Sequence, residues 1–283
     1  MYTHLAICGG GVKGCAIIGA LEALDDNIDL SKIKNIIGSS VGGIIALLFT
    51  VGYKPCEMNE IFLNINLCNY RKIKISNLFT KYGVDDCRLM LRLIKACILQ
   101  KINNYDFTFK ELYEQTKINL ILTGTDISNA QTIYYSHTLT PDIKVIDIIR
   151  ITISYPFLYE PIYDTNKDIY LLDGAILNQY PINYFKNIKN KIGICFKANE
   201  SKKDVNSILS YIHAFVYSLI NFNLKKTIVK YEKNTILINI DGIHSLDYAL
   251  DYNKKNYMRN VGYNTSVDYI NTTMTNIYNN NLL

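Results

Sequence analysis

Apolar runs that end in glycine alternate with stretches of helical spacing at the start of the chain. Leu5–Cys8 is apolar and leads directly into three glycines, which is typical of a buried strand entering a tight turn. Val12–Leu24 follows, with apolar residues on one helical face. A second apolar run ends at Gly38, and Val41–Thr50 is apolar on nearly all sides, as in a helix buried under a sheet. Two successive strand–turn–helix units predict a parallel α/β sheet.

The same periodicities continue through the rest of the chain. Further strands are predicted at Leu120–Thr123, Thr132–Tyr135, Ile169–Leu172, Ile192–Phe196 and Ile236–Ile240. Helices are predicted at Cys56–Asn66, Asp86–Gln100, Lys144–Ser154, Val205–Leu224 and Asn253–Ile270. Since no repeat or long linker interrupts them, residues 1–275 are expected to form one domain, and the Asn-rich residues 276–283 are expected to fray.

Composition places the chain among ordinary globular proteins. Of its 283 residues, 49% are hydrophobic and 19% are charged, which excludes wholesale disorder. The longest apolar run, residues 36–51, is interrupted by Gly38, Ser39 and Ser40, so no transmembrane helix is expected. The first residues lack a basic region followed by an apolar core, so no signal peptide is visible.

The cysteines point to a reducing compartment. There are seven, an odd number, and no C-x-x-C pair occurs, so neither a disulfide framework nor a zinc site is expected. Reduced and buried cysteines favour a cytoplasmic protein.

Positive charge is concentrated in one part of the chain. The net charge is +5, and residues 70–101 contain eight basic against two acidic residues. Within them Arg88, Arg92 and Lys95 form one stripe of a predicted helix whose other side is apolar. Such a helix fits either peripheral contact with an anionic membrane or an ordinary solvated face. Mild basicity alone does not indicate nucleic acid, which is not expected as a partner.

The first candidate for chemistry is the G-x-S-x-G sequence Gly38-Ser39-Ser40-Val41-Gly42, between a predicted strand and helix. Glycines on both sides let the backbone bend sharply and keep the serine hydroxyl accessible. The helix that follows directs its N-terminus at the same place. A nucleophilic serine and a simple serine N-cap fit this pentapeptide about equally well.

The second candidate is the glycine loop Gly9-Gly10-Gly11-Val12-Lys13-Gly14, at the other strand-to-helix turn. Bare backbone N–H groups beside a helix start form an anion cradle, which in acyl transfer is an oxyanion hole. The loop also fits the dinucleotide fingerprint G-x-G-x-x-G of a nicotinamide-dependent oxidoreductase. That alternative needs an acidic residue at the end of the second strand, where this chain has Gly-Ser-Ser.

The third candidate is Asp173-Gly174-Ala175, directly after a predicted strand. An aspartate there can accept a proton from a nearby hydroxyl, although an aspartate in an ordinary turn is the commoner case. A Ser–His–Asp triad would need His213, which lies in a helical pattern, or His244, which lies in a predicted loop. Since neither histidine sits in a motif, a Ser–Asp pair comes first.

These three motifs, in this order, resemble the patatin-like phospholipase family, whose pattern is G-G-G-x-[RK]-G, then G-x-S-x-G, then D-G-[GA]. The resemblance extends to Asp106–Leu112, which is similar to the family's T-F-x-x-L helix start, and to Thr123–Asp126. Residues 150–157 with Pro161 are similar to its R-A-S-x-A-x-P-x-x-F-x-P stretch, except that Ile151 and Thr152 replace the usual small pair.

The resemblance implies a three-layer α/β fold, with helices on both faces of a central, mostly parallel sheet. It implies that Ser40 is the nucleophile and Asp173 the base of a lipid acyl hydrolase of the phospholipase A or lysophospholipase type. The implied oxyanion hole is the loop Gly9, Gly10, Gly11, Val12, Lys13 and Gly14, in which Gly10, Gly11 and Val12 would offer the N–H groups with Lys13 beside them. Gly38 and Gly42 shape the serine turn, and Gly174 and Ala175 follow the base. The implied substrate is a phospholipid or other lipid ester, with no metal or organic cofactor.

Two further interpretations stay open beside this one. An α/β-hydrolase esterase would use His213 or His244 between the serine and the aspartate. A catalytically silent lipid-interface protein would retain the fold without turnover, although the presence of both Ser40 and Asp173 speaks against it.

Overall fold

The computed structural model describes residues 1–198 and 205–280, except for the side chains of residues 209 and 274–280. Its centre is an eight-stranded sheet of order β10-β9-β1-β2-β4-β8-β7, with β5 paired to β4 outside this path. The strands are β1 (His4–Ile7), β2 (Asn35–Gly38), β4 (Asn119–Asp126), β5 (Gln131–Tyr135), β7 (Ile162–Asp164), β8 (Ile169–Asp173), β9 (Lys191–Phe196) and β10 (Thr235–Ile238). A separate pair joins β3 (Gly83–Asp85) to β6 (Phe157–Tyr159).

The five strands β10, β9, β1, β2 and β4 run parallel, as the sequence predicts. The remaining three strands, β5, β7 and β8, run antiparallel to their neighbours. Helices cross over between the parallel strands, which gives the mixed, mostly parallel sheet of a three-layer α/β fold.

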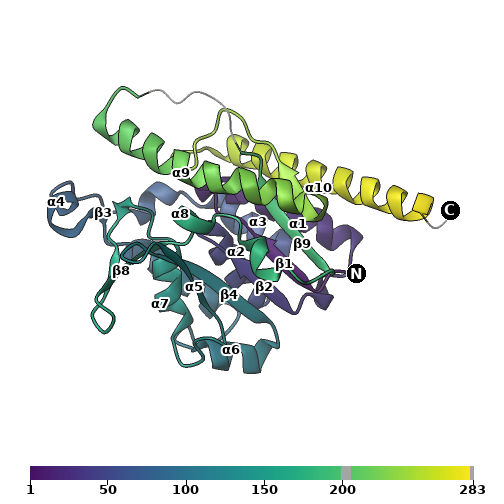
Figure 1. The fold of residues 1–283 in the computed structure, drawn as a ribbon, viewed down its shortest axis with the longest axis horizontal. Coiled ribbons are helices and arrows are strands. Elements are labelled where there is room, and N and C mark those ends of the chain that lie inside the picture. The colour runs from purple at the N-terminus through teal and green to yellow at the C-terminus, as the bar shows by residue number, and fades with distance from the viewer. Residues whose placement is uncertain (199–204, 281–283) are drawn as a thin grey trace.

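The helices form the two outer layers (Figure 1). They are α1 (Gly14–Asn27), α2 (Val41–Thr50), α3 (Pro55–Asn64), α4 (Asn77–Lys81), α5 (Arg88–Leu99), α6 (Phe109–Thr116), α7 (Val145–Thr152), α8 (Ala175–Asn178), α9 (Ile208–Tyr231) and α10 (Tyr252–Asn280). Short 3-10 turns are η1 (Gly11–Lys13), η2 (Leu30–Lys32), η3 (Leu67–Tyr70), η4 (Pro181–Phe185) and η5 (Glu232–Asn234).

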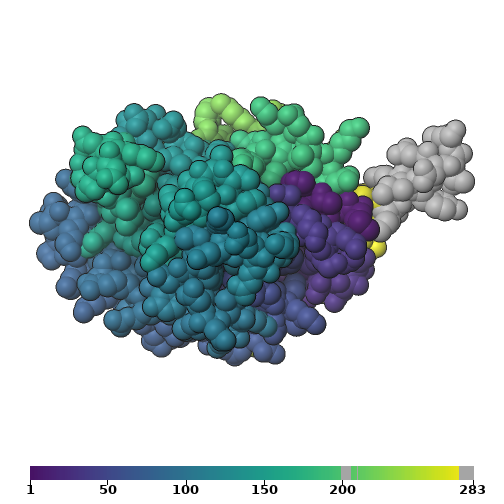
Figure 2. Space-filling model, turned by 90° about the horizontal axis from the view of Figure 1, so that it is seen from below, coloured from purple at the N-terminus to yellow at the C-terminus, as the bar shows by residue number. Residues whose placement is uncertain are grey.

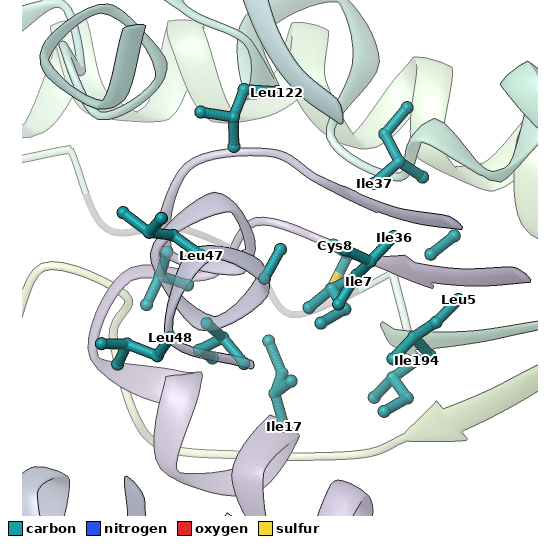
Figure 3. Packing of buried hydrophobic residues seen from close by; sticks show 14 of the residues in the cluster. Leu5, Ile7, Cys8, Ile17, Ile36, Ile37, Leu47, Leu48, Leu122 and Ile194 are labelled. Atoms are coloured by element: carbon teal, nitrogen blue, oxygen red, sulfur yellow. The ribbon is translucent and has the colours of Figure 1, made fainter. Parts of the chain in front are cut away.

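Neighbouring residues of β1 show which elements cover which face. The His4 ring packs on Phe185 of η4. Leu5 and Ile7, which point to the opposite face, pack with Ile17 of α1 (Figure 3). The helices α1 and α2 therefore cover one face, and η4 covers the other together with α8 and α9, which contact each other.

The core lies between β1, β2 and β9 on one side and α1 and α2 on the other. Figure 3 shows Leu5 and Ile7 beside Ile36 and Ile194, and all four side chains are fully buried. Apolar contact on this scale supplies most of the stabilisation of such a layer.

The helices α1 and α10 cross at very close range, and two glycines permit it. A Cβ atom at Gly19 would lie 2.0 Å from the carbonyl oxygen of Arg259, and one at Gly262 would lie 1.9 Å from that of Ala16. Since any side chain there would collide with backbone, both positions require glycine.

Each predicted strand and helix has a counterpart in the structure, and Val41–Thr50 has the predicted bounds. Helix α9 continues to Tyr231, beyond its predicted end. The backbone of α10 continues to Asn280, into the segment 276–283 for which we expect fraying, and residues 281–283 of that segment lie outside the described part. Across 1–198 and 205–280, no helix has both the length and the apolar character needed to span a bilayer.

Candidate active site

The carboxyl ends of two strands meet on one edge of β4. β5 occupies the other edge, so β2 and β8 share the remaining one. Leu122 of β4 pairs with Gly38, the last residue of β2, and Gly124 pairs with Asp173, the last residue of β8. Because β2 runs parallel and β8 antiparallel to β4, their ends approach each other head-on. The register of β4 thereby brings Asp173 next to Ser40, which follows β2 after one residue.

Ser40 occupies a strained turn. Its backbone has φ 54° and ψ −129°, a conformation that is uncommon for a residue other than glycine. The flanking glycines are required by close approach, since a Cβ at Gly38 would lie 2.2 Å from the carbonyl oxygen of Gly42, and one at Gly42 would lie 2.4 Å from that of Cys8. The turn directs the Ser40 hydroxyl toward β8, where it donates to Asp173 Oδ2 over 2.7 Å.

Asp173 is fully buried and held by hydrogen bonds. Its Oδ1 accepts from the backbone N–H of Ala175 at 2.8 Å, while Oδ2 accepts from Ser40. Its backbone carbonyl accepts from the Thr125 hydroxyl at 2.9 Å. Burial raises the pKa of Asp173 to about 7, and the two hydrogen bonds to the carboxylate oppose that rise. The carboxyl can therefore take up and release a proton near neutral pH.

The glycine loop lies beside Ser40, but part of it is already engaged. The N–H of Gly9 donates to the carbonyl of Gln179, and the N–H of Val12 donates to that of Ser245, both at 2.9 Å. The buried Lys13 ammonium donates to the Ile240 carbonyl at 3.3 Å. The sequence expectation that Val12 offers a free N–H is therefore wrong, because the carbonyl of the loop at Ser245 occupies it.

Three other residues of the site have backbone N–H groups that are not engaged in this way. Gly10, Gly11 and Val41 line the same pocket as Ser40. Within the described residues none of their N–H groups has a hydrogen-bond partner. Gly11 has φ +56°, a backbone conformation that favours glycine. Val41 directly follows the candidate nucleophile at the start of α2, so the G-x-S-x-G motif itself could have indicated this third donor.

The pocket is mainly apolar. Its walls come from α2, α3, α5 and α9, and include Ile44, Leu48, Phe62, Leu93, Ile94 and Ile220. Such a lining suits a long hydrocarbon chain next to the Ser40 hydroxyl. No cluster of three or more His, Cys, Asp or Glu side chains that could hold a metal occurs in the part of the chain that the structure covers.

His213 of α9, which the sequence offered only as a member of a Ser–His–Asp triad, lies in the wall of this pocket. Its Nδ1 lies 3.1 Å from the hydroxyl of Tyr155, and its ring lies 4.2 Å from that of His244. The 2.7 Å contact between Ser40 and Asp173 leaves no room for an imidazole between them. No motif marks His213, because the packing of α9 on α8 brings it to the site, whereas Tyr155 belongs to the stretch 150–157, whose Ser154 carbonyl accepts from the N–H of Asp173.

The basic residues predicted on α5 lie on the side of that helix away from the pocket, which its apolar residues line. Arg88 pairs with Asp86, and the Lys95 ammonium lies 4.5 Å from the centre of the Tyr105 ring. Arg92 is exposed. This arrangement is typical of an amphipathic helix packed on its own domain.

Comparisons with known proteins give a family, two viral relatives and a shared fold. A family model described as "Patatin-like phospholipase" matches residues 5–186. The uncharacterized protein R571 of Acanthamoeba polyphaga mimivirus is 31% identical over 275 residues, 92% of this chain and 90% of that protein. The probable lipid hydrolase 463L of Invertebrate iridescent virus 6 is 28% identical over 196 residues, 67% of this chain and 66% of that protein. The crystal structure of VipD from Legionella pneumophila shares the fold, with a TM-score of 0.65 at 13% identity, over 96% of this chain and 67% of VipD.

Proposed function

The chain belongs to the patatin-like phospholipase family, and on that premise we propose that it hydrolyses carboxylic esters of phospholipids with Ser40 as nucleophile and Asp173 as base. The observation that carries the proposal is the 2.7 Å hydrogen bond from the Ser40 hydroxyl to a buried carboxyl whose pKa is raised to about 7. A carboxylate in that state is matched to proton transfer at neutral pH.

The proposed reaction has two halves. In the first, Ser40 Oγ attacks the ester carbonyl carbon and its proton passes to Asp173 Oδ2. The negative oxygen of the tetrahedral intermediate accepts hydrogen bonds from the free N–H groups of Gly10, Gly11 and Val41. The C–O bond of the ester then breaks, and the alcohol leaves with the proton from Asp173.

In the second half, water attacks the acyl–Ser40 ester and gives a proton to Asp173. The Ser40–acyl bond breaks, the fatty acid leaves, and the proton returns to Ser40 Oγ. The apolar walls from α2, α3 and α5 support a long acyl chain as the part of the substrate that the pocket holds.

The experiment measures hydrolysis of a mixed phospholipid extract, with mass spectrometry of the products. We expect Ser40→Ala and Asp173→Asn each to abolish fatty acid release while circular dichroism shows a folded protein. A fluorophosphonate probe should label wild type and leave Ser40→Ala unlabelled. Full activity in either variant rejects the Ser–Asp pair, and an unlabelled wild-type protein favours the catalytically silent alternative.

The position of His213 in the pocket wall keeps the Ser–His–Asp alternative testable. That alternative predicts that His213→Ala or His244→Ala is inactive. Our proposal predicts that both retain hydrolysis of a small soluble ester, because neither ring lies between Ser40 and Asp173.

The free cysteines support the cytoplasmic location proposed from the sequence. All seven are unpaired, and five of them are buried. Peripheral contact with a lipid surface belongs to the same proposal, because a phospholipid substrate resides in a membrane.

A further inference from the structure

Four large apolar side chains are exposed within one short stretch, residues 71–82, which we call the basic-apolar segment. The exposed fractions are 55% for Ile73, 72% for Ile75, 81% for Phe79 and 56% for Tyr82. Figure 1 shows α4, which lies within this segment, at one end of the molecule, and the blue atoms of this part of the chain form the left rim of Figure 2. Exposed large apolar residues that are gathered in one segment indicate an interaction surface.

The same segment is uniformly positive. It contains Arg71, Lys72, Lys74 and Lys81, and no acidic residue occurs from 67 to 84. The three lysines are exposed and alternate with the exposed apolar residues. Lys81 has a distant ion pair with Glu160 at 3.6 Å. Cations interleaved with isoleucine and aromatic side chains are complementary to anionic headgroups above an acyl layer.

The backbone of the basic-apolar segment is firmly held. The N–H of Lys72 donates to Asp85 Oδ2 and the N–H of Lys74 donates to the Val84 carbonyl, both at 2.7 Å. Asn77 Nδ2 donates to Glu160 Oε1 at 2.9 Å. The apolar side chains therefore project from a platform that is hydrogen-bonded to β3 and to Glu160.

This platform adjoins the pocket. Leu67, just before the segment, lines the pocket, as does Tyr159 of β6. The Arg71 guanidinium lies 4.5 Å from the centre of the Tyr248 ring, which also lines the pocket. A lipid surface bound by the basic-apolar segment would therefore lie close to the pocket wall.

We propose that the basic-apolar segment docks the protein on an anionic phospholipid bilayer, with Ile73, Ile75, Phe79 and Tyr82 entering the interface and the lysines binding the headgroups. The proposal rests on the proposed function, since a phospholipid must leave the bilayer to reach Ser40. It differs from docking through α5, whose Arg88 is already paired and whose Met90 and Ile94 are buried.

The experiment measures flotation with vesicles of phosphatidylcholine alone or mixed with phosphatidylserine, in the inactive Ser40→Ala background. The combined Ile75→Ser and Phe79→Ser variant is expected to lose binding to the mixed vesicles by about tenfold or more. Combined Lys72→Gln, Lys74→Gln and Lys81→Gln should remove the preference for phosphatidylserine and the sensitivity to salt. The matched control is Leu139→Ser, whose leucine is 53% exposed elsewhere and whose loss should leave binding unchanged.

A second readout separates this proposal from the proposed function. When Ser40 is left unchanged, so that the protein is active, all segment variants should hydrolyse a small soluble ester at the wild-type rate. None of the changed residues lines the pocket. If the protein with an unchanged segment binds neither vesicle type, the docking proposal is overturned. The remaining interpretation of this surface is then a binding site for a protein partner. Loss of binding in Phe215→Ser with Phe222→Ser on α9, or in Arg92→Gln on α5, with none in the segment variants, also overturns it.

Discussion

Burial and hydrogen bonding act on the Asp173 carboxyl in opposite directions. Loss of water raises its pKa, whereas the bonds from Ala175 N–H and the Ser40 hydroxyl stabilise the charged form. The balance leaves the pKa at about 7 and makes this one side chain the source of both a pH-dependent rate and a pH-dependent stability.

The rate should follow the unprotonated carboxylate. We expect kcat/KM for a soluble short-chain ester to rise with pH and to level off above about pH 7, because only the carboxylate accepts the Ser40 proton. His213→Ala should leave the midpoint of this profile unchanged. A profile that is flat between about pH 5 and pH 8 would contradict the raised pKa.

The free energy of unfolding should fall as the pH rises, whereas kcat/KM increases. The ordinary pKa of the carboxyl is 3.8 and the folded value is about 7, so between these values the folded protein binds more protons than the unfolded chain. Raising the pH through this window therefore destabilises the fold. Asp173→Asn should be more stable than wild type by on the order of a few kcal/mol at pH 8 and nearly equal to it at pH 4.

Denaturant titrations at the two pH values measure this difference. Ser40→Ala, which retains the carboxyl, serves as the control. It should still lose stability as the pH rises, with the midpoint moved upward because the hydrogen bond that lowers the pKa of Asp173 is gone. A constant difference between Asp173→Asn and wild type at both pH values would argue against a buried, high-pKa carboxyl.

The length of each helix or strand determined whether the spacing of its apolar residues could predict it. The strands β1, β2 and β9 and the helices α2 and α5 gave clear apolar patterns because they pack directly in the core. The strands β3, β6 and β7 span three residues each, too few for a period to show. Helix α6 was indicated by the family's helix start, and its N-cap Thr108 accepts from the N–H of Glu111.

The crossing of α1 and α10 gives a prediction at this scale. Gly262→Ala should lower the free energy of unfolding by several kcal/mol, because its Cβ would lie 1.9 Å from the Ala16 carbonyl oxygen. The matched control on the same helix is Asn264→Ala, which is exposed and should change stability by no more than about 0.5 kcal/mol. Equal stabilities of the two variants would mean that the helices separate at little cost.

In the whole molecule, the family match ends at residue 186, but the central sheet does not. β9 pairs with β1 and β10 pairs with β9, and both follow that point in the chain. A chain ending at residue 190 would leave β1 as an open sheet edge and remove α10 from α1.

We therefore expect a chain of residues 1–190 to aggregate or to lack cooperative unfolding. A chain of residues 1–275 is the control and should unfold like the chain of residues 1–283, because its missing tail is the segment predicted to fray. Size-exclusion chromatography and thermal denaturation distinguish the two cases. A soluble, cooperatively folding 1–190 fragment would show that the matched part is a domain by itself.

The candidate site was predictable only in part. The sequence singled out Ser40, Asp173 and the glycine loop, which lie together in the structure, because strand-to-helix turns carry local signals in glycine and in apolar runs. It failed for Val12, whose N–H is taken by a carbonyl more than two hundred residues away in the chain. It offered His213 only for a triad and did not bring it to Tyr155, since a contact between remote elements leaves no local pattern.

The shared edge of β4 has a mechanical consequence. Pairing with the same strand, β4, sets the positions of both reacting groups. A slide or tilt of β4 therefore moves the ends of β2 and β8 together. Such a displacement moves the pair within its cavity but changes the gap between hydroxyl and carboxylate far less. The covering helices can therefore be rebuilt extensively without putting the two groups out of reach of each other.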